Sequence, residues 1–223
     1  MNMKLLSLSI LVLAQLGWQF SEARAVKTKS QVRAEAKAAK ANTALDELDP
    51  YAPNVEEQLN ALDKQYEKST GVSPFIVEDL FDTGFGDRGC VRDACAVWAQ
   101  VVKSTQRLYL YQNGQLINTW LVSTGLPPAH GTPNFDTHPN GRIYDAYTSG
   151  KYPGGDYNGL GNMPYAVFIK GGFAIHGTGR GNWRKLGSKA SHGCIRVHPD
   201  NALIFNRLVR ENGIKNVWIT VQN

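Results

Sequence analysis

Residues 107–122 read Arg-Leu-Tyr-Leu-Tyr-Gln-Asn-Gly-Gln-Leu-Ile-Asn-Thr-Trp-Leu-Val, and this stretch determines the fold class. Two strand-like runs, residues 107–112 and 115–122, flank the pair Asn113-Gly114. Asn and Gly both tolerate the positive φ that a type I′ turn needs, so the pair is a strong hairpin signal. We therefore predict a β-hairpin here, within a strand-dominated domain.

Further strand signals lie on both sides of this hairpin. Alternating apolar residues at 97–101 predict a strand before it, and residues 217–221 predict a final strand. Residues 166–169 and 173–176 predict a second hairpin around a Gly-Gly pair. The chain from residue 96 onward is therefore expected to consist mostly of strands.

One helix and one long loop complete this domain. Pro199 suits the first turn of a helix and Gly213 suits its end, and apolar residues between them share a face. Residues 126–163 are rich in Gly, Pro, Asn and Asp, which predicts a loop. A loop this long in a compact domain is often functional.

The first 25 residues have the pattern of a secretory signal. Lys4 gives a positive start, residues 5–16 form an apolar run, and Ala23-Arg24-Ala25 supplies small residues for a signal peptidase. The run is too short to span a membrane comfortably, so we expect cleavage after Ala25 rather than a retained anchor. We therefore expect an exported protein with no stable membrane span after signal removal.

The rest of the chain divides into three parts. Residues 26–71 are expected to form a helical or flexible segment, residues 72–95 a loop-rich bridge, and residues 96–223 the main domain. Residues 26–95 hold 9 Lys/Arg and 13 Asp/Glu, whereas the main domain holds 13 and 5 and is therefore basic. A basic domain suggests an anionic partner, with plain solubility as the alternative, and export argues against nucleic acid.

One helix is predicted inside the N-terminal segment. Asn54 and Glu57 have the spacing of a capping box at its start, and Gly71 ends it. Its apolar face consists of Leu59, Leu62 and Tyr66. The helix either packs on the main domain through this face or only lies next to it.

The three cysteines are interpreted in the light of export. Outside the cytosol thiols tend to pair, and Cys90 and Cys95 are close enough in sequence to close a small loop. We predict a disulfide between them. Cys194 is left over, and an odd cysteine in a secreted protein is either an intermolecular link or a reactive thiol.

The motif Ser191-His192-Gly193-Cys194 favours the reactive thiol. A nearby imidazole or several backbone amides would lower the pKa of the thiol and supply the thiolate. Gly193 permits a tight backbone that directs the amides of residues 193 and 194 at a developing oxyanion. His176 and His192 are both candidate bases, and the loop after His176 is long enough to bring it to Cys194.

A structural role and a metal site are the alternatives. A lone cysteine is commonly a small buried hydrophobe, yet core positions do not call for the glycine pattern found here. A nucleophilic site explains that pattern better. Four residues are possible metal ligands: His176, His192, Cys194 and His198. No Cys-x-x-Cys or His-x-x-x-His spacing is present, so we expect no metal and no cofactor.

These residues resemble a known family signature. Ala174-Ile-His-Gly-Thr178 and Ala190-Ser-His-Gly-Cys-Ile-Arg196 look like the two conserved segments of the YkuD-type L,D-transpeptidase catalytic domain. Arg196 stands where the strictest form of that signature has Asn. The resemblance extends over roughly residues 96–221, and its Ser-His-Gly-Cys part is highly specific.

The resemblance implies a fold and a reaction. The fold is mainly β, a YkuD-like sandwich of two mixed sheets with one or two helices, here preceded by the helical N-terminal segment. The thiolate attacks the carbonyl of the third residue of a peptidoglycan stem peptide and releases the terminal D-alanine. An amine of a neighbouring stem peptide then attacks the resulting thioester.

The resemblance also implies residue roles. Cys194 is the nucleophile, and His176 is the general base, with its ring oriented by the Gly177 carbonyl. The amides of Gly193 and Cys194 are the expected oxyanion donors. The residues that support the active site are His192, Gly193, Ser191 and Gly177.

Three further residues are candidates for substrate binding. Arg196 is expected to contact a substrate carboxylate or to buttress the loop. Arg180 lies in a basic loop between the two catalytic segments, where a solvated surface is an equal alternative. Tyr165 is expected to line the cleft, although core tyrosines are common. Three histidines are expected to be structural: His130, His138 and His198.

Three functions are compatible with the sequence. The leading one is an exported transpeptidase that forms cross-links or attaches protein to the wall. A hydrolase, either an L,D-carboxypeptidase or an amidase, would use water in place of the amine. A catalytically inactive wall-binding module would need neither His176 nor Cys194. We expect a monomer in the periplasm or cell envelope that acts on stem peptides, both donor and amine acceptor.

Overall fold

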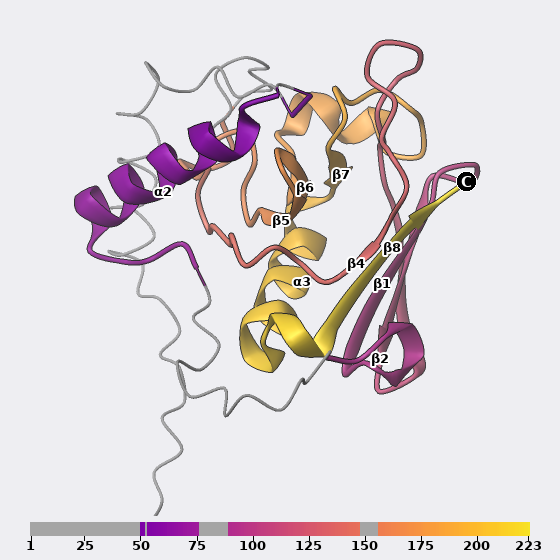
Figure 1. The fold of residues 1–223 in the computed structure, drawn as a ribbon. Coiled ribbons are helices and arrows are strands. Elements are labelled where there is room, and N and C mark those ends of the chain that lie inside the picture. Colours follow the sequence, from indigo (N-terminus) through magenta and orange to yellow (C-terminus); the bar gives the residue numbers. More distant parts are fainter. Residues whose placement is uncertain (1–49, 52, 76–88, 148–155) are drawn as a thin grey trace, which may run out of the picture.

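A computed structural model describes two mixed β-sheets with helices around them (Figure 1). The described residues are 50–51, 53–75, 89–147 and 156–223. The predicted signal over residues 1–25, the first part of the N-terminal segment and most of the bridge lie outside them. Within the described ranges, no helix is long and apolar enough to cross a membrane.

The larger sheet has five strands in the order β3-β2-β1-β8-β4. They are β1 (Val97–Val102), β2 (Arg107–Gln112), β3 (Gln115–Leu121), β4 (Phe135–Thr137) and β8 (Val217–Gln222). β1 and β8 are parallel, and the other neighbouring strands are antiparallel. Asn113 and Gly114 join β2 to β3 with φ of 49° and 74°, so the hairpin predicted from this pair is confirmed.

The smaller sheet has three strands in the order β5-β6-β7. They are β5 (Val167–Lys170), β6 (Phe173–Gly177) and β7 (Ile195–Val197). β5 and β6 form the second predicted hairpin, whereas β6 and β7 are parallel. The connection between the parallel strands contains the short 3-10 helix η2 (Arg180–Lys185).

Helix α3 (Pro199–Asn212) begins and ends where the sequence predicts. The His198 side chain accepts a hydrogen bond from the Asp200 N–H, and Gly213, with φ of 77°, follows the last turn. α3 packs against β6 and β1, so it lies between the two sheets (Figure 1). Three of its side chains enter the main core: Ala202, Phe205 and Val209.

Helix α2 (Val55–Thr70) confirms the predicted N-terminal helix, but its start differs from the prediction. Asn54 is the N-cap residue, with φ −103° and ψ 23°, and its side chain bonds to no backbone amide of the first turn. Its Oδ1 instead accepts from Gln58 Nε2 at 2.8 Å. The predicted capping box with Glu57 is therefore wrong, because the N-cap backbone is not extended and does not turn the side chain onto the helix. Gly71 ends the helix with φ of 68°.

The described part of α2 packs on the main domain. Leu59 and Tyr66 are buried in a cluster with Tyr144 and Phe168, and the rings of Tyr66 and Tyr144 meet edge to face. This arrangement decides between the two alternatives for the helix. α2 is attached through the apolar face that the sequence predicts, as far as the described side chains show.

A buried ion network reinforces this attachment. Arg142 Nε donates to Asp63 Oδ2 at 2.7 Å, and its Nη1 donates to Glu56 Oε2 at 2.9 Å. Its Nη2 donates to Asn60 Oδ1 at 2.6 Å, and the Tyr144 hydroxyl also donates to Asp63. Arg142 and Asp63 are 5% and 4% exposed. Four side-chain oxygen atoms of the helix, from Glu56, Asn60 and Asp63, therefore accept hydrogen bonds from the main domain.

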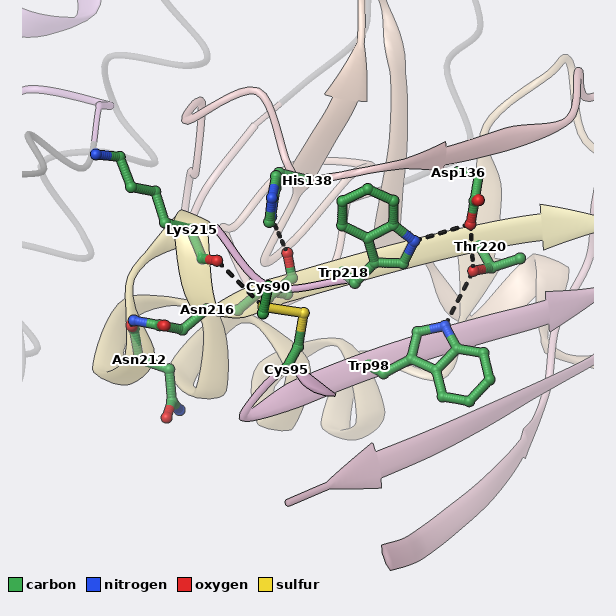
Figure 2. The surroundings of a disulfide bond; sticks show 11 residues. Cys90, Cys95, Trp98, Asp136, His138, Asn212, Lys215, Asn216, Trp218 and Thr220 are labelled. Carbon is green, nitrogen blue, oxygen red and sulfur yellow. Dashed lines mark hydrogen bonds between the residues drawn. A yellow bond between two sulfur atoms is a disulfide. The ribbon is translucent and has the colours of Figure 1, made fainter. Parts of the chain in front are cut away.

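A disulfide joins Cys90 to Cys95 at the end of the larger sheet where β1 begins (Figure 2). It closes a loop around the 3-10 helix η1 (Arg92–Ala94), as the spacing predicts. The Cys90 N–H donates to the Lys215 carbonyl at 3.3 Å, so the loop is also attached to the residues before β8. The disulfide therefore joins the entry to β1 to the entry to β8.

We expect Asp63→Ala to lower the free energy of unfolding by about 3 kcal/mol, because it leaves the Arg142 guanidinium buried without its closest carboxylate. Urea denaturation followed by far-UV circular dichroism measures this loss. Lys64→Ala changes the exposed neighbour on the same helix and should stay within about 0.5 kcal/mol of the wild type. Equal stability of the two variants would contradict a structural role for the network.

Candidate active site

Five of the predicted site residues line one pocket: His176, Ser191, His192, Cys194 and Arg196. The parallel pairing of β6 and β7 brings them together, because Ile175 pairs with Ile195 and His176 with Arg196. Cys194 directly precedes β7, and this register sets it beside Ala174. Residues 174 and 176 point to the same face of β6, since side chains alternate along a strand. The thiol and the imidazole therefore face the same pocket.

His176 is held in one orientation by its own strand end. Its Nδ1 lies 2.6 Å from the Gly177 carbonyl oxygen, the contact that the resemblance implies. A carbonyl only accepts hydrogen bonds, so Nδ1 carries the proton and Nε2 of the neutral ring is the basic nitrogen. Burial lowers the pKa of His176 to about 3, against a smaller opposing effect of the Gly177 contact. The ring is therefore neutral at pH 7.

Gly177 is required by close packing. A Cβ on this residue would lie 2.9 Å from Pro164 Cγ and 2.9 Å from Pro199 Cα. The Gly177 N–H donates to the Pro164 carbonyl at 2.8 Å. The peptide that orients His176 is therefore fixed between two prolines, one before β5 and one at the start of α3.

Cys194 is the free cysteine of the chain, and its thiol lies against the β5–β6 turn. Sγ is 3.4 Å from the Gly172 carbonyl oxygen. Burial raises the pKa of the thiol to about 11, although the Ala174 backbone and the Arg196 charge act in the opposite direction. The expectation of a lowered thiol pKa is therefore wrong for this structure, because loss of hydration outweighs the nearby donors. The site holds a neutral thiol and a neutral imidazole.

Hydrogen bonds fix the turn before Cys194. Ser191 Oγ donates to the Cys194 carbonyl and accepts from the Gly193 N–H at 3.2 Å. Thr132 Oγ1 donates to the Gly193 carbonyl at 2.6 Å. Gly193 has φ of 122°, a conformation that favours glycine.

One of the two expected oxyanion donors has a partner in this structure. The Gly193 N–H is already occupied by Ser191. The Cys194 N–H, in contrast, forms no hydrogen bond with another of the described residues. Of the two expected donors, only the Cys194 amide is available in this state of the site.

Arg196 brings a buried positive charge to the pocket. It is 8% exposed, and its Nη1 donates to the Ala190 carbonyl at 3.0 Å, so it does buttress the loop. Its Nη2 lies 3.4 Å from His192 Nδ1. No carboxylate of the described residues pairs with it. Burial lowers the pKa of Arg196, which still remains a cation. Burial also lowers the pKa of His192, with a further contribution from the Arg196 charge.

A family model for the L,D-transpeptidase catalytic domain, YkuD, matches residues 96–219, more than half of the chain. The chain belongs to this family. No curated protein matches the chain. The two mixed sheets confirm the fold expected from the resemblance.

Several solved structures are similar to the chain. An L,D-transpeptidase from Mycobacterium smegmatis is 21% identical, with a TM-score of 0.43 over 58% of this chain and 60% of that one. One from Mycobacterium tuberculosis H37Rv is 19% identical, with a TM-score of 0.42 over 58% and 59%. One from Xylanimonas cellulosilytica is 19% identical, with a TM-score of 0.42 over 74% and 69%. The match thus spans less than two thirds of either mycobacterial chain.

Two predicted residues of this YkuD domain lie away from the pocket. Tyr165 does not line it, because its ring packs on Ala146 and Leu160, with the Arg207 guanidinium 5.9 Å from the ring centre. Its φ of 57° belongs to a tight loop, which the sequence does not reveal. Arg180 is exposed and lies over Trp183, 5.6 Å from the ring centre. Arg180 thus lies on the surface, and its role in substrate binding stays a prediction.

Other pocket residues were not anticipated. They come from four separate parts of the chain: Pro50, Tyr147, Asn162, Met163, Phe168, Gly172, Thr178 and Asn182. Thr178 and Asn182 follow His176 in the YkuD signature region and are joined by a hydrogen bond of 3.1 Å. The closeness of Thr178 and Asn182 to His176 in the sequence is the only feature of this set that indicates a place in the pocket. Pro50 lies outside the matched residues altogether.

We expect the alkylation of Cys194 by iodoacetamide to rise about tenfold per pH unit from pH 7 to pH 9, because only the thiolate reacts. With a pKa of about 11, about one thiol in 10⁴ is ionised at pH 7. Mass spectrometry of the intact protein gives the rates, and a cysteine peptide with an ordinary thiol serves as the control. A rate that levels off below pH 8 would show a stabilised thiolate and contradict the neutral pair.

Proposed function

We propose that the protein is a cysteine-dependent acyltransferase that acts on peptidoglycan stem peptides as an L,D-transpeptidase. The observation that carries the proposal is the pairing in one pocket of a free thiol, Cys194, with a histidine whose tautomer is fixed. Such a histidine presents a single basic nitrogen, which is what a nucleophilic thiol needs in order to lose its proton. Membership of the YkuD family supports the same chemistry.

Acylation begins from the neutral pair. As Cys194 Sγ forms its bond to the substrate carbonyl carbon, its proton passes to His176 Nε2. The Gly177 carbonyl accepts from the Nδ1–H throughout and stabilises the imidazolium that forms. The Cys194 N–H donates to the oxyanion of the tetrahedral intermediate. His176 then returns the proton to the leaving D-alanine amine as the C–N bond breaks, and a thioester remains.

Transfer reverses these proton movements. The amine of an acceptor stem peptide attacks the thioester carbon and gives a proton to His176 Nε2. The C–S bond breaks, the thiolate recovers its proton from the imidazolium, and a new amide is released. His176 thus acts first as base and then as acid in each half-reaction, and both Cys194 and His176 end in their starting protonation states.

Arg196 supports an anionic substrate. Its guanidinium lacks a carboxylate partner among the described residues, although it is almost fully buried. A buried cation of this kind is stabilised when a ligand carboxylate enters the site. Stem peptides carry carboxylates next to the scissile bond, and we propose that Arg196 is oriented toward one of them.

An envelope location is part of the proposal. The signal-like residues 1–25 support export, and a disulfide such as Cys90–Cys95 persists in oxidising compartments outside the cytosol. Peptidoglycan is assembled there. We propose a monomer in the periplasm or cell envelope.

The central experiment incubates the full-length mature protein with purified tetrapeptide stem fragments, with and without an amine acceptor. We expect acceptor-linked product and released D-alanine, analysed by mass spectrometry. Cys194→Ala should abolish turnover and leave the circular dichroism spectrum unchanged. D-alanine release without linked product would identify a carboxypeptidase. No turnover at all would leave a binding module and overturn the proposal.

A second prediction assigns the base. His176→Gln should lower the acylation rate by a factor of about 10² to 10⁴, because no other group takes the thiol proton. His192→Gln should retain measurable activity, since this ring contacts Arg196 and His130 and shapes the site. Burst-phase acylation rates separate the two variants. If His192→Gln were inactive while His176→Gln acylated normally, the roles would be exchanged.

A further inference from the structure

The segment before the family-matched residues reaches the active site. Pro50 lines the same pocket as Cys194 and His176. A Cβ on Gly172 would lie 2.7 Å from Pro50 Cα, so the two backbones are in direct contact. Gly172 is also the residue whose carbonyl oxygen lies 3.4 Å from the Cys194 thiol. One residue of the β5–β6 turn therefore separates Pro50 from the nucleophile.

Tyr51, the next residue, packs over Gly193 in the turn that directly precedes Cys194. Its hydroxyl oxygen lies 2.9 Å from the position of a Cβ on Gly193. The hydroxyl donates to the Gly131 carbonyl at 3.3 Å, and the ring meets Phe173 edge to face with centroids 5.2 Å apart. Tyr51 thus touches three separate segments around the pocket, while 41% of its surface stays exposed.

Helix α2 attaches this segment to the catalytic strands. Glu56 accepts from the Gly171 N–H through Oε1 at 3.1 Å and from Arg142 through Oε2 at 2.9 Å. Val55 Cγ1 lies 3.2 Å from the Cβ position of Gly171. The start of α2 therefore contacts Gly171 in the β5–β6 turn. The next residue of that turn, Gly172, contacts the Cys194 thiol.

The helix and the pocket also share one hydrophobic cluster. Phe168 and Met163 line the pocket and pack in the cluster that contains Leu59 and Tyr66 of α2. Cys194 is packed against the same cluster. Without α2, Phe168 and Met163 would lose their packing against Leu59 and Tyr66. Arg142 would also lose its hydrogen bonds to the helix.

We infer that the described residues 50–51 and 53–70 are a working part of the active site, in which Pro50 lines the substrate pocket, Tyr51 packs over the Gly193 turn beside it, and Glu56 positions the Gly171-Gly172 turn. This inference rests on the proposed acyl transfer. Pro50 is a wall residue of the binding pocket, whereas Tyr51 and Glu56 are positioning residues that act through the Gly193 and Gly171-Gly172 turns. The YkuD domain at residues 96–219 therefore does not contain its complete pocket.

The test uses single substitutions in the full-length mature chain. We expect Tyr51→Ala to raise KM for the stem peptide and Glu56→Ala to lower kcat, each reducing kcat/KM by at least about tenfold. Glu57→Ala is the matched control, because Glu57 is the exposed neighbour of Glu56 in the same turn of the helix and should behave as the wild type. Tyr51→Phe keeps the ring on Phe173, and Glu56→Gln keeps an acceptor for Gly171, so both should recover most of the activity.

Iodoacetamide alkylation of Cys194 is a second readout that does not depend on the proposed substrate. Loss of the Tyr51 ring, which packs on Phe173 and over Gly193 next to Cys194, should raise the alkylation rate several-fold in Tyr51→Ala, with no change in Glu57→Ala. If the wild type transfers no acyl group, the proposed function fails, and the alkylation rates alone decide the inference. If Glu56→Ala does not fold, the half-exposed Tyr51 still carries the test.

Two results would overturn the inference. Unchanged acyl transfer and unchanged alkylation in Tyr51→Ala would make the segment structural only. A rise of both rates in that variant would mean that residues 50–51 obstruct the pocket rather than form part of it.

Discussion

The parallel pairing of β6 with β7 is the constraint on which the site depends. Its register brings residues that are far apart in the chain to one pocket, since His176 pairs with Arg196 and Cys194 precedes the paired residues. A shift of one residue would turn Cys194 or His176 to the opposite face of the sheet. The register is secured on both sides, because Ser123 pairs with Arg196 and Gly177 is enclosed by Pro164 and Pro199. The chemistry is thus set by strand geometry rather than by a flexible loop.

Burial gives this site its electrostatic character. The same loss of hydration moves the pKa of His176 downward and that of Cys194 upward, so both groups are uncharged before substrate arrives. In the proposed reaction, charge develops only after substrate binding, where the low dielectric strengthens each interaction with the Gly177 carbonyl and the Arg196 cation. A neutral thiol of this kind is less susceptible to oxidation than a thiolate, because oxidants react mainly with the thiolate form.

The sequence predicted the elements well, and the structure brings His176 and Cys194 together as expected, but the surroundings of the thiol could not be predicted. Asn113-Gly114, Pro199 and Gly213 have strong local conformational preferences, so the hairpin and α3 followed from short-range patterns. The depth of Cys194, the occupied Gly193 amide and the position of Tyr165 depend on packing between distant segments. The contact of Pro50 with Gly172 is of the same kind. No pattern within either segment indicates that the other is near, and only tertiary structure brings them together.

The interior position of β8 in the larger sheet affects how the chain acquires its structure. β8 lies between β1 and β4 and is parallel to β1, although more than a hundred residues separate the two strands in the sequence. Pairing over such a separation is slow, because the entropy of closing the intervening chain is lost before the contacts compensate. The sheet cannot be completed until residues 217–222 are available. The larger sheet of a nascent chain therefore stays incomplete until the last residues have been made.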